Sequence, residues 1–361
     1  MKLAPLLARA KTAADLDFNA DICPTIEQSA NFLRQLQSYV VRVLCRYHRD
    51  FKHYLEIPIL QNVPRRRMPD GHKTKQFPLH ITTIDESTTV GNIAVHHDTY
   101  ITQLKLTYKD LSDMAIPSIN DQSTNARIRG AKALRAQDVN PFTRVQCFQL
   151  GFGLFHLCLN LIWALLHVHR GHINRVGSLS HWFAILEKTR LGNAHPDYHS
   201  LLAAFMQILD GLILDAWRLE CGSATLAAFA ASKPTPESLL SIANTIIRNH
   251  ATPMVEPHGD EQDNNAKKPA DDKAYQNLRL LTHDLLYVAE LTRAISDGDW
   301  GRVEDMISNL AMIFRGAGSN NYCTEILHFI HNLKKVWKGD GFEYGSLINL
   351  FVAIHVTHFL Q

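Results

Sequence analysis

The segment from residue 115 to residue 169 constrains the fold more than any other part of this sequence. Two short apolar runs, Ala115–Ile119 and Arg144–Gln149, have the length and the flanking turn residues of β-strands. A helix is predicted between them over Ser123–Gln137, and the apolar run Gly151–Val168 follows. The order strand, helix, strand, helix is typical of a small α/β unit.

The rest of the chain is predicted to be mainly helical. Apolar residues recur at helical spacing over Thr25–Arg49, and the pattern after Gly171 is wholly helical. Ser178 and Thr235 are placed as N-caps, and Gly222 as the glycine that ends a helix. The further predicted helices are Ser178–Thr189, Asp197–Glu220, Pro236–Asn249, Asp272–Ile295, Trp300–Phe314 and Asn320–Val336. Three more short runs are predicted to be extended: Tyr54–Leu60, Leu79–Ile84 and Ile93–Val95.

We therefore expect an α/β fold dominated by helices, in which a small mixed sheet forms the core and a large all-helical part is inserted. The expected divisions are an N-terminal helical segment 1–53, an α/β core portion 54–170, a helical insertion 171–297 and C-terminal helices 298–361 that return to the core. The polar stretch 259–271 is predicted to be a mobile loop inside the insertion.

Composition restricts the classes of function. The chain has 361 residues and a formal net charge of +2, so a nucleic-acid surface would have to be a local patch. The 6 cysteines include no C-x-x-C pair, which argues against zinc and favours reduced, buried thiols in an intracellular protein. Neither a G-x-G-x-x-G motif nor a P-loop is present, so no nucleotide cofactor is expected.

The apolar run Gly151–Val168 could be mistaken for a membrane span. Its length is close to the minimum of about 18 residues that crosses a bilayer. However, it contains His156 and Asn160 one helical turn apart, and polar side chains in mid-span are costly in lipid. We therefore expect a buried helix and no membrane partner, with a membrane-associated helical protein as a third reading of the chain.

Two acids from distant parts of the sequence are the candidates for chemistry. Asp121 follows a predicted strand and precedes a helix, and Glu325 lies in the predicted helix Asn320–Val336. Two carboxylates brought together in this way could hold a divalent metal. The alternative is structural: Asp121 would cap its helix, and Glu325, placed in the first turn, would interact with the helix dipole.

Several basic and polar residues accompany these acids. Arg127 and Arg129 lie on the helix after Asp121, while Arg302 and Arg315 lie near Glu325 in sequence. They could contact phosphates, or they could belong to solvated or structural helix faces. Asp299, which precedes Arg302, is expected to cap a helix.

His156 is either a hydrogen-bonded core histidine or a polar group at a metal or phosphate. The spacing of His167, His169 and His172 does not favour a metal site, because the three do not share one helix face. The loop cluster Arg65-Arg66-Arg67, with Lys73 and Lys75, is either a solvated loop, a nucleic-acid patch or a nuclear address.

A series of short motifs resembles the fungal family known as domain of unknown function 6589. Its elements include Gly-Asp-Gln-Leu-Thr, Arg-Ile-Arg-Gly-Ala, a Phe-His helix, Gly-Asp-x-Gly-Arg and Phe-x-Gly-Ala-Gly-x-x-Asn-Tyr-x-x-Glu. The similarity covers roughly residues 60–337 in consistent order. The matching segments are 121–131, 155–160, 177–181, 197–199, 214–217, 298–302 and 314–325.

This family is similar to transposon-encoded proteins with a ribonuclease-H-like core that a helical insertion interrupts. The resemblance implies three metal-binding acids, with Asp121 as the second and Glu325 as the third. Asp85, which follows a predicted strand, is the weaker candidate for the first. These acids would bind Mg²⁺ or Mn²⁺, and His156 with Arg127 or Arg129 would position a DNA phosphate.

The chain departs from the family pattern at several points. Asn120 stands where the family has glycine, Ser123 stands where it has leucine, and the family ending is not recognised after Trp337. These departures predict an incomplete metal site in a fragment of a longer element. We therefore expect a transposase-related, DNA-binding protein that is inactive as a nuclease, located inside the cell and in the nucleus if the arginine cluster is an address. The alternative is a non-catalytic helical module that binds other proteins.

Overall fold

The computed structural model describes residues 2–73, 75–253 and 273–337, which divide into two compact units. Among the described residues, unit 1 contains those of 2–25, 65–160 and 294–337, and unit 2 contains those of 26–64, 161–253 and 273–293. The described residues are 66% helical, which confirms that helices dominate the fold. The stretch 259–271, predicted as a mobile loop, lies outside the described residues.

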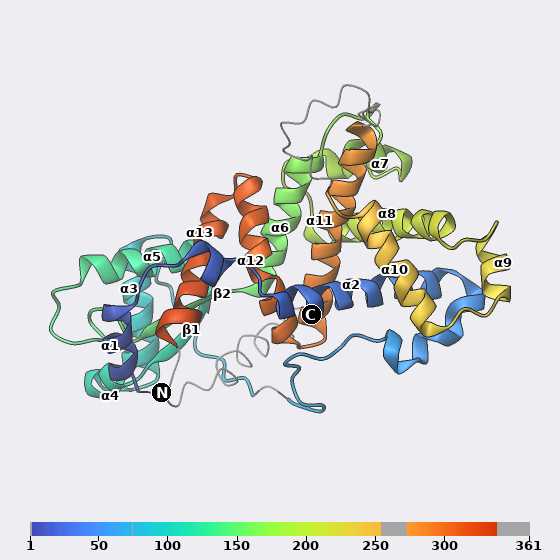
Figure 1. Ribbon diagram of the computed structural model, residues 1–361. Helices are drawn as coiled ribbons and strands as arrows, with labels where there is room; N and C mark the ends of the chain where they lie inside the picture. The colour runs from blue at the N-terminus through green and yellow to red at the C-terminus, as the bar shows by residue number, and fades with distance from the viewer. Residues whose placement is uncertain (1, 74, 254–272, 338–361) are drawn as a thin grey trace, which may run out of the picture. The chain divides into compact units, whose positions relative to one another are not determined.

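Unit 1 is built around two parallel strands, β1 (Ile116–Asn120) and β2 (Phe148–Phe152), which pair in register from Ile116 opposite Phe148 to Asn120 opposite Phe152. Helix α5 (Gln122–Leu134) connects them, since parallel strands require a crossover. Figure 1 shows α5 and α13 (Asn320–His331) beside the strand pair. The other elements of the unit are α1 (Ala4–Thr12), η1 (Phe18–Ile22), α3 (Thr89–His97), η4 (Asp98–Gln103), α4 (Tyr108–Asp113), the start of α6 (Leu154–His169), the end of α11 (Lys273–Ser296), α12 (Trp300–Gly316) and η6 (Asn332–Val336).

The sheet is smaller than the sequence predicted. The described residues contain this parallel pair where a mixed sheet was expected. Ile93–Val95, predicted as a strand, lies inside α3, because the Thr88 side chain accepts the N–H of Gly91 and starts a helix there. Leu79–Ile84 has no regular structure. Short apolar runs fit a strand and a buried helical turn equally well, which explains the error at Ile93–Val95.

Within its described residues, unit 2 contains helices joined by loops and no strand. The segment Tyr54–Leu60, predicted as a strand, instead lies in two 3₁₀ helices, and Tyr54 is buried. The elements are α2 (Ile26–Tyr47), η2 (Arg49–Glu56), η3 (Pro58–Leu60), the remainder of α6, α7 (Leu179–Ile185), η5 (Thr189–Gly192), α8 (Tyr198–Glu220), α9 (Leu226–Ala231), α10 (Pro236–His250) and most of α11.

The core of unit 2 joins α2 to α8. The indole nitrogen of Trp217 donates to the carbonyl of Val40 at 3.0 Å, and the buried Asp210 accepts from the hydroxyls of Tyr39 at 2.7 Å and Tyr47 at 2.9 Å. Burying a carboxylate is costly unless it is hydrogen-bonded, so these contacts fix how α8 packs on α2.

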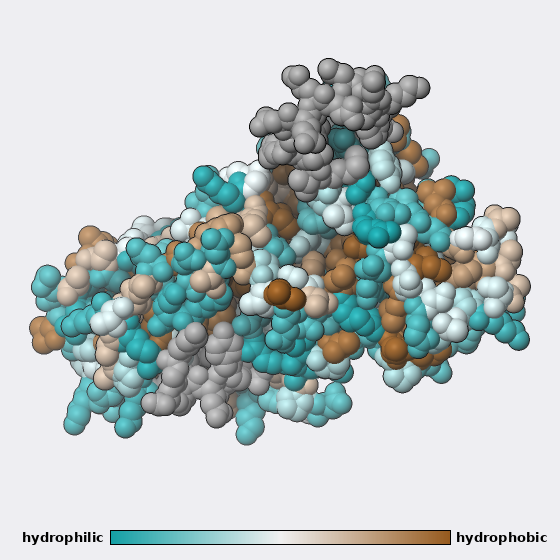
Figure 2. Space-filling model, viewed as in Figure 1, coloured by the Kyte–Doolittle hydropathy of each residue, from teal (hydrophilic) through white to brown (hydrophobic). Residues whose placement is uncertain are grey.

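Within the described residues, α8 is the one helix that is long and apolar enough to cross a membrane, and half of the window that qualifies it is buried in the protein. The buried, hydrogen-bonded Asp210 near its middle fits a core helix. The visible face in Figure 2 mixes hydrophilic and hydrophobic residues. The apolar run after Gly151 forms α6, a largely buried helix as predicted.

Candidate functional site

Asp121 lies at the carboxyl end of β1, where α5 begins. Its Oδ1 accepts the backbone N–H of Thr124 at 2.6 Å, which is the geometry of an N-cap. The capping interpretation is therefore confirmed. The cap uses Oδ1 of the carboxylate. Asp121 still lies at the end of β1, as the sequence predicted.

Glu325 is buried, with 2% of its surface exposed. Its Oε1 accepts from Asn125 Nδ2 at 2.8 Å, and the Arg129 guanidinium donates to both oxygens, at 3.1 Å and 2.6 Å. The prediction that Glu325 is a first-turn acid was wrong, because α13 begins at Asn320 and its first turn holds no acid. The side chain is held by α5, about 200 residues earlier in the chain.

Tyr322 lies one helical turn before Glu325 on α13. Its hydroxyl accepts a hydrogen bond from Asn160 Nδ2 at 2.8 Å. Burial raises the Tyr322 pKa first, and the negative charges of Asp121 and Glu325 raise it further. The hydroxyl is thus surrounded by negative charge and stays protonated at neutral pH. The family motif Asn-Tyr-x-x-Glu includes this tyrosine, but sequence reasoning gave it no role, although its spacing of three from Glu325 on one helix face was a readable signal.

Asn125 joins the sheet to these helices, and sequence reasoning missed it too. The side chain is fully buried, and its Nδ2 donates to the carbonyl of Gly151 at 2.9 Å as well as to Glu325. Its Oδ1 accepts from Asn120 Nδ2 at 2.9 Å. Asn125 and Arg129 are four residues apart on α5 and so face Glu325 together.

The carboxylates as arranged do not fit the metal that the family resemblance implies. A divalent cation would need free oxygens on Glu325, but Arg129 and Asn125 already occupy both of them. Asp85, the weaker candidate for a third ligand, is exposed and bonds to Ser87, whose backbone N–H is the largest cause that lowers the Asp85 pKa. Across the described residues, no group of three or more His, Cys, Asp or Glu side chains could hold a metal ion.

A cavity of about 320 Å³ opens beside the Arg129–Glu325 pair. Lys132 lines it and donates from Nζ to the carbonyl of Phe148 at 2.7 Å. Burial lowers the pKa of Lys132 to about 8, and burial followed by the Arg129 charge lowers the pKa of His328. Two cations and one carboxylate therefore give this cavity a positive balance near neutral pH.

The other predicted site residues differ in their exposure to solvent. His156 is exposed, so the core-histidine interpretation was wrong, and its carbonyl accepts from Asn160. Arg127 is partly exposed on α5, and the exposed Arg315 donates to Asn320. Arg302 is buried and pairs with Asp297, which gives it a structural role.

The Gly-Asp-x-Gly-Arg motif at residues 298–302 binds the backbone at Arg65 and Arg66, where the segment 65–160 of unit 1 begins. Asp299 caps α12 as predicted, and its carboxylate also accepts the backbone N–H groups of Arg65 and Arg66, both at 2.8 Å. A Cβ on Gly301 would lie 2.5 Å from the Arg65 Cβ, so the passing chain requires glycine there.

The side chains of the arginine cluster are also engaged within unit 1. Arg65 bonds to Asp305 at 2.9 Å, Arg66 pairs with Glu304, and Arg67 approaches Asp70 at 3.5 Å. These ion pairs give the three arginines a structural role. The sequence alone had left three interpretations of the cluster: a nuclear address, a nucleic-acid patch and a solvated loop. The three histidines at 167, 169 and 172 have different surroundings. His169 pairs with Asp284 at 2.7 Å, whereas His167 is exposed.

Comparison with known proteins gives one match. The model described as "Family of unknown function (DUF6589)" matches residues 11–350. The match begins before residue 60 and continues past Trp337, so it is longer at both ends than the resemblance predicted. No curated protein and no solved structure matches the chain.

Proposed function

The chain belongs to the DUF6589 family, and we propose on that premise that it is a transposase-related, nucleic-acid-binding protein whose metal site has been replaced by an internal ion pair. The observation that carries the proposal is the two-point contact between Arg129 and Glu325. In this proposal the Arg129 guanidinium neutralises the Glu325 carboxylate, as a divalent cation would in an active relative. The parallel strand pair with Asp121 at its end is the remnant of a ribonuclease-H-like sheet in this proposal, and the helices of residues 161–293 are the insertion.

The positions of the accessible polar groups support nucleic-acid binding. Arg127 and His156 come from the two helices that carry Asn125 and Asn160, and Arg315 lies at the end of α12, just before the helix of Glu325. Arginine and histidine side chains at a surface contact phosphate oxygens without reading sequence. With a net charge of +2 for the whole chain, accessible arginines such as these would supply most of the attraction to DNA.

DNA binding tests the first half of the proposal. The full chain is titrated into a fluorescein-labelled duplex at several salt concentrations, and anisotropy is measured. We expect the logarithm of the association constant to fall linearly with the logarithm of salt concentration. Replacing Arg127 and Arg315 by Gln should reduce the slope by about 1 to 2. Arg218→Gln, an exposed arginine of unit 2 paired with Asp215, is the matched control.

Failure of the duplex to bind, or equal slopes for the double variant and the control, would sink the nucleic-acid assignment and leave the helical protein-binding module. The second half is tested with labelled DNA and millimolar Mn²⁺. We expect no cleavage by the native chain. Cleavage that Glu325→Gln abolishes would show a working metal site and overturn the replacement by Arg129.

A further inference from the structure

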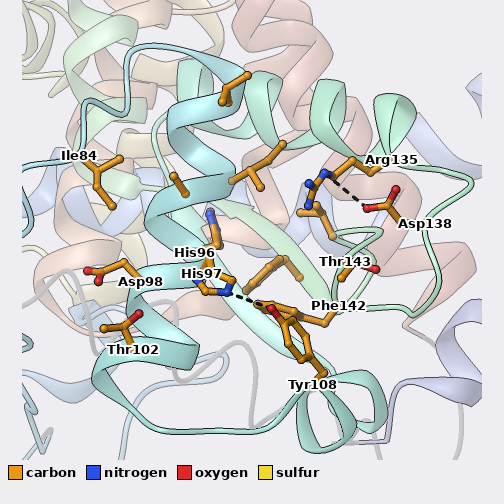
Figure 3. A pocket seen from close by; sticks show the side chains of 15 residues that line it. Ile84, His96, His97, Asp98, Thr102, Tyr108, Arg135, Asp138, Phe142 and Thr143 are labelled. Atoms are coloured by element: carbon orange, nitrogen blue, oxygen red, sulfur yellow. Dashed lines mark hydrogen bonds and ion pairs between the residues drawn. The ribbon is translucent and has the colours of Figure 1, made fainter.

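Unit 1 contains a second, larger cavity of about 610 Å³ that the proposed function does not use. The residues that line it all lie between Ile84 and Phe148, on α3, on the π-helical turn η4, at Tyr108 and on the connection before β2 (Figure 3). The volume is within the range of about 300 to 1,000 Å³ that small-molecule sites occupy. One continuous stretch of sequence therefore builds the whole cavity.

Aromatic rings form much of the wall. The ring centres of Tyr108 and Phe142 are 5.7 Å apart, those of Phe142 and Phe148 are 6.2 Å apart, and those of His96 and Phe148 are 4.3 Å apart. His97 lies against Tyr108 and hydrogen-bonds to its hydroxyl at 3.0 Å. Rings at these separations offer faces and edges on which a planar heterocycle such as a nucleobase stacks.

The polar groups at the cavity select the kind of heterocycle. Arg135 pairs with Asp138 at 3.5 Å, both side chains are partly exposed, and Asp98 lines the cavity opposite them (Figure 3). Two carboxylates and one guanidinium leave an excess of negative charge, which disfavours a phosphate or a fatty acid. The same acceptors suit the amino hydrogens at the edge of adenine, cytosine or guanine.

His96 adds an acceptor that is uncharged. Its Nδ1 lies 2.6 Å from the carbonyl of Asn92, so Nδ1 carries the proton and Nε2 keeps its lone pair in the neutral ring. Burial lowers the His96 pKa, and the nearby Lys132 charge lowers it further, although the hydrogen bond to Asn92 opposes both effects. The charged groups that act on His96 are Lys132 of α5 and Glu86, whose carboxylate raises the pKa, while Asp98, Asp138 and Arg135 line the cavity.

Two costly backbone conformations occur at this cavity. Val145, which lines it, has a φ of +59°, a region that a β-branched residue rarely adopts. The π-helical turn η4 brings Asp98 and Thr102 to the wall. Both kinds of strain concentrate at functional sites, where the surrounding structure maintains them for a purpose. This observation is independent of the ring geometry and of the charges.

We propose that this cavity binds a single unstacked nucleobase that carries an exocyclic amino group. The base stacks on Tyr108 and Phe142, while Asp98 and Asp138 accept its amino hydrogens. The proposal deepens the proposed function and rests on it for the source of the base, which is a strand of nucleic acid. The same ring chemistry could also come from a free nucleoside, and the experiment separates the two sources.

The test uses the full chain and 2-aminopurine, whose fluorescence falls when the base stacks. The probe is offered as the free riboside, within a single-stranded oligonucleotide and within a duplex. We expect saturable quenching with the single strand and weaker quenching with the riboside. Saturable quenching by the riboside alone would support the cavity while assigning it to a free nucleoside. Adenosine should compete with the bound riboside, and inosine, which lacks the amino group, should compete about tenfold less well.

Two variants decide whether the quenching comes from this cavity. Asp138→Asn, at a partly exposed position that folding tolerates, should weaken quenching about tenfold and remove the preference for adenosine over inosine. Asp215→Asn, in the similar exposed Arg218–Asp215 pair of unit 2, should change nothing. Absence of saturable quenching by every probe, or equal effects of the two variants, would overturn the proposal. The salt dependence of duplex binding is measured in a separate titration. That titration tests the proposed function, whatever the outcome for the cavity.

Discussion

Replacing Arg129 by Met tests how strongly the internal ion pair supports unit 1. The methionine keeps the apolar stem in place but removes the guanidinium from Glu325, which then retains one hydrogen bond, from Asn125. Breaking a buried ion pair by removing one partner costs about 3–5 kcal/mol. The Arg129 side chain is 26% exposed and that of Glu325 is 3% exposed, so water reaches the arginine side and we expect a loss of about 3 kcal/mol.

A double-mutant cycle with Glu325→Gln isolates the pair. The glutamine still accepts hydrogen bonds but carries no charge, so alone it should cost about 1–2 kcal/mol. Adding Glu325→Gln to Arg129→Met removes the unpaired buried charge, so the double variant should be more stable than the sum of the single losses by about 2 kcal/mol.

The free energies are obtained from urea unfolding followed by circular dichroism at constant pH and salt. Arg127→Met, two residues earlier on the same helix, is the control and should stay within about 0.5 kcal/mol of the native chain. If Arg129→Met costs less than about 1 kcal/mol, or if the coupling is below about 0.5 kcal/mol, the ion pair does not hold the site together and the reasoning fails.

Two further changes test other parts of unit 1. Burial lowers the Lys132 pKa to about 8, so between that pH and the ordinary value of 10.5 the unfolded chain binds the extra proton and stability rises with pH. Lys132→Met should thus stabilise the protein at pH 7 by about 2 kcal/mol, after subtracting the lost bond to the Phe148 carbonyl, and urea titrations at pH 7 and 10.5 should show this gain disappear. An equal effect at both pH values would refute the burial argument. Gly301→Ala places a Cβ 2.5 Å from the Arg65 Cβ and should cost about 2 kcal/mol in thermal unfolding, whereas Gly211→Ala, with nothing within 4 Å, should gain about 0.5 kcal/mol. Equal melting temperatures for the two variants would contradict the close packing at Gly301.

Helices and their first residues could be predicted from the sequence because their signals are local. Ser178, Thr235 and Asp299 cap the helices that were predicted to begin after them. In each case the side chain accepts an N–H only three residues away, so the pattern is complete within one turn. The cap at Asp121 was found for the same reason, because its carboxylate accepts the N–H of Thr124.

The extended segments were predicted poorly because a strand requires a partner. The run at Ile93–Val95 is as apolar as β1, yet it lies in a helix. β1 is a strand because Ile116 and its successors pair with β2, which is buried along its whole length. Hydrogen bonds between strands come from a second segment, and the sequence of one segment does not state which segment that is.

The sequence by itself determined the long helices and the residues that cap several of them. It also placed Asp121 and Glu325 beside arginines and glycine turns. The tertiary structure alone decided what Glu325 does. On the sequence it was a helix-dipole acid or a metal ligand, and in the fold it is a buried anion neutralised by Arg129 and fixed by Asn125. The physical reason is that backbone conformation depends on neighbours within a turn, whereas the partners of a buried charge depend on which distant surfaces meet once the chain has folded.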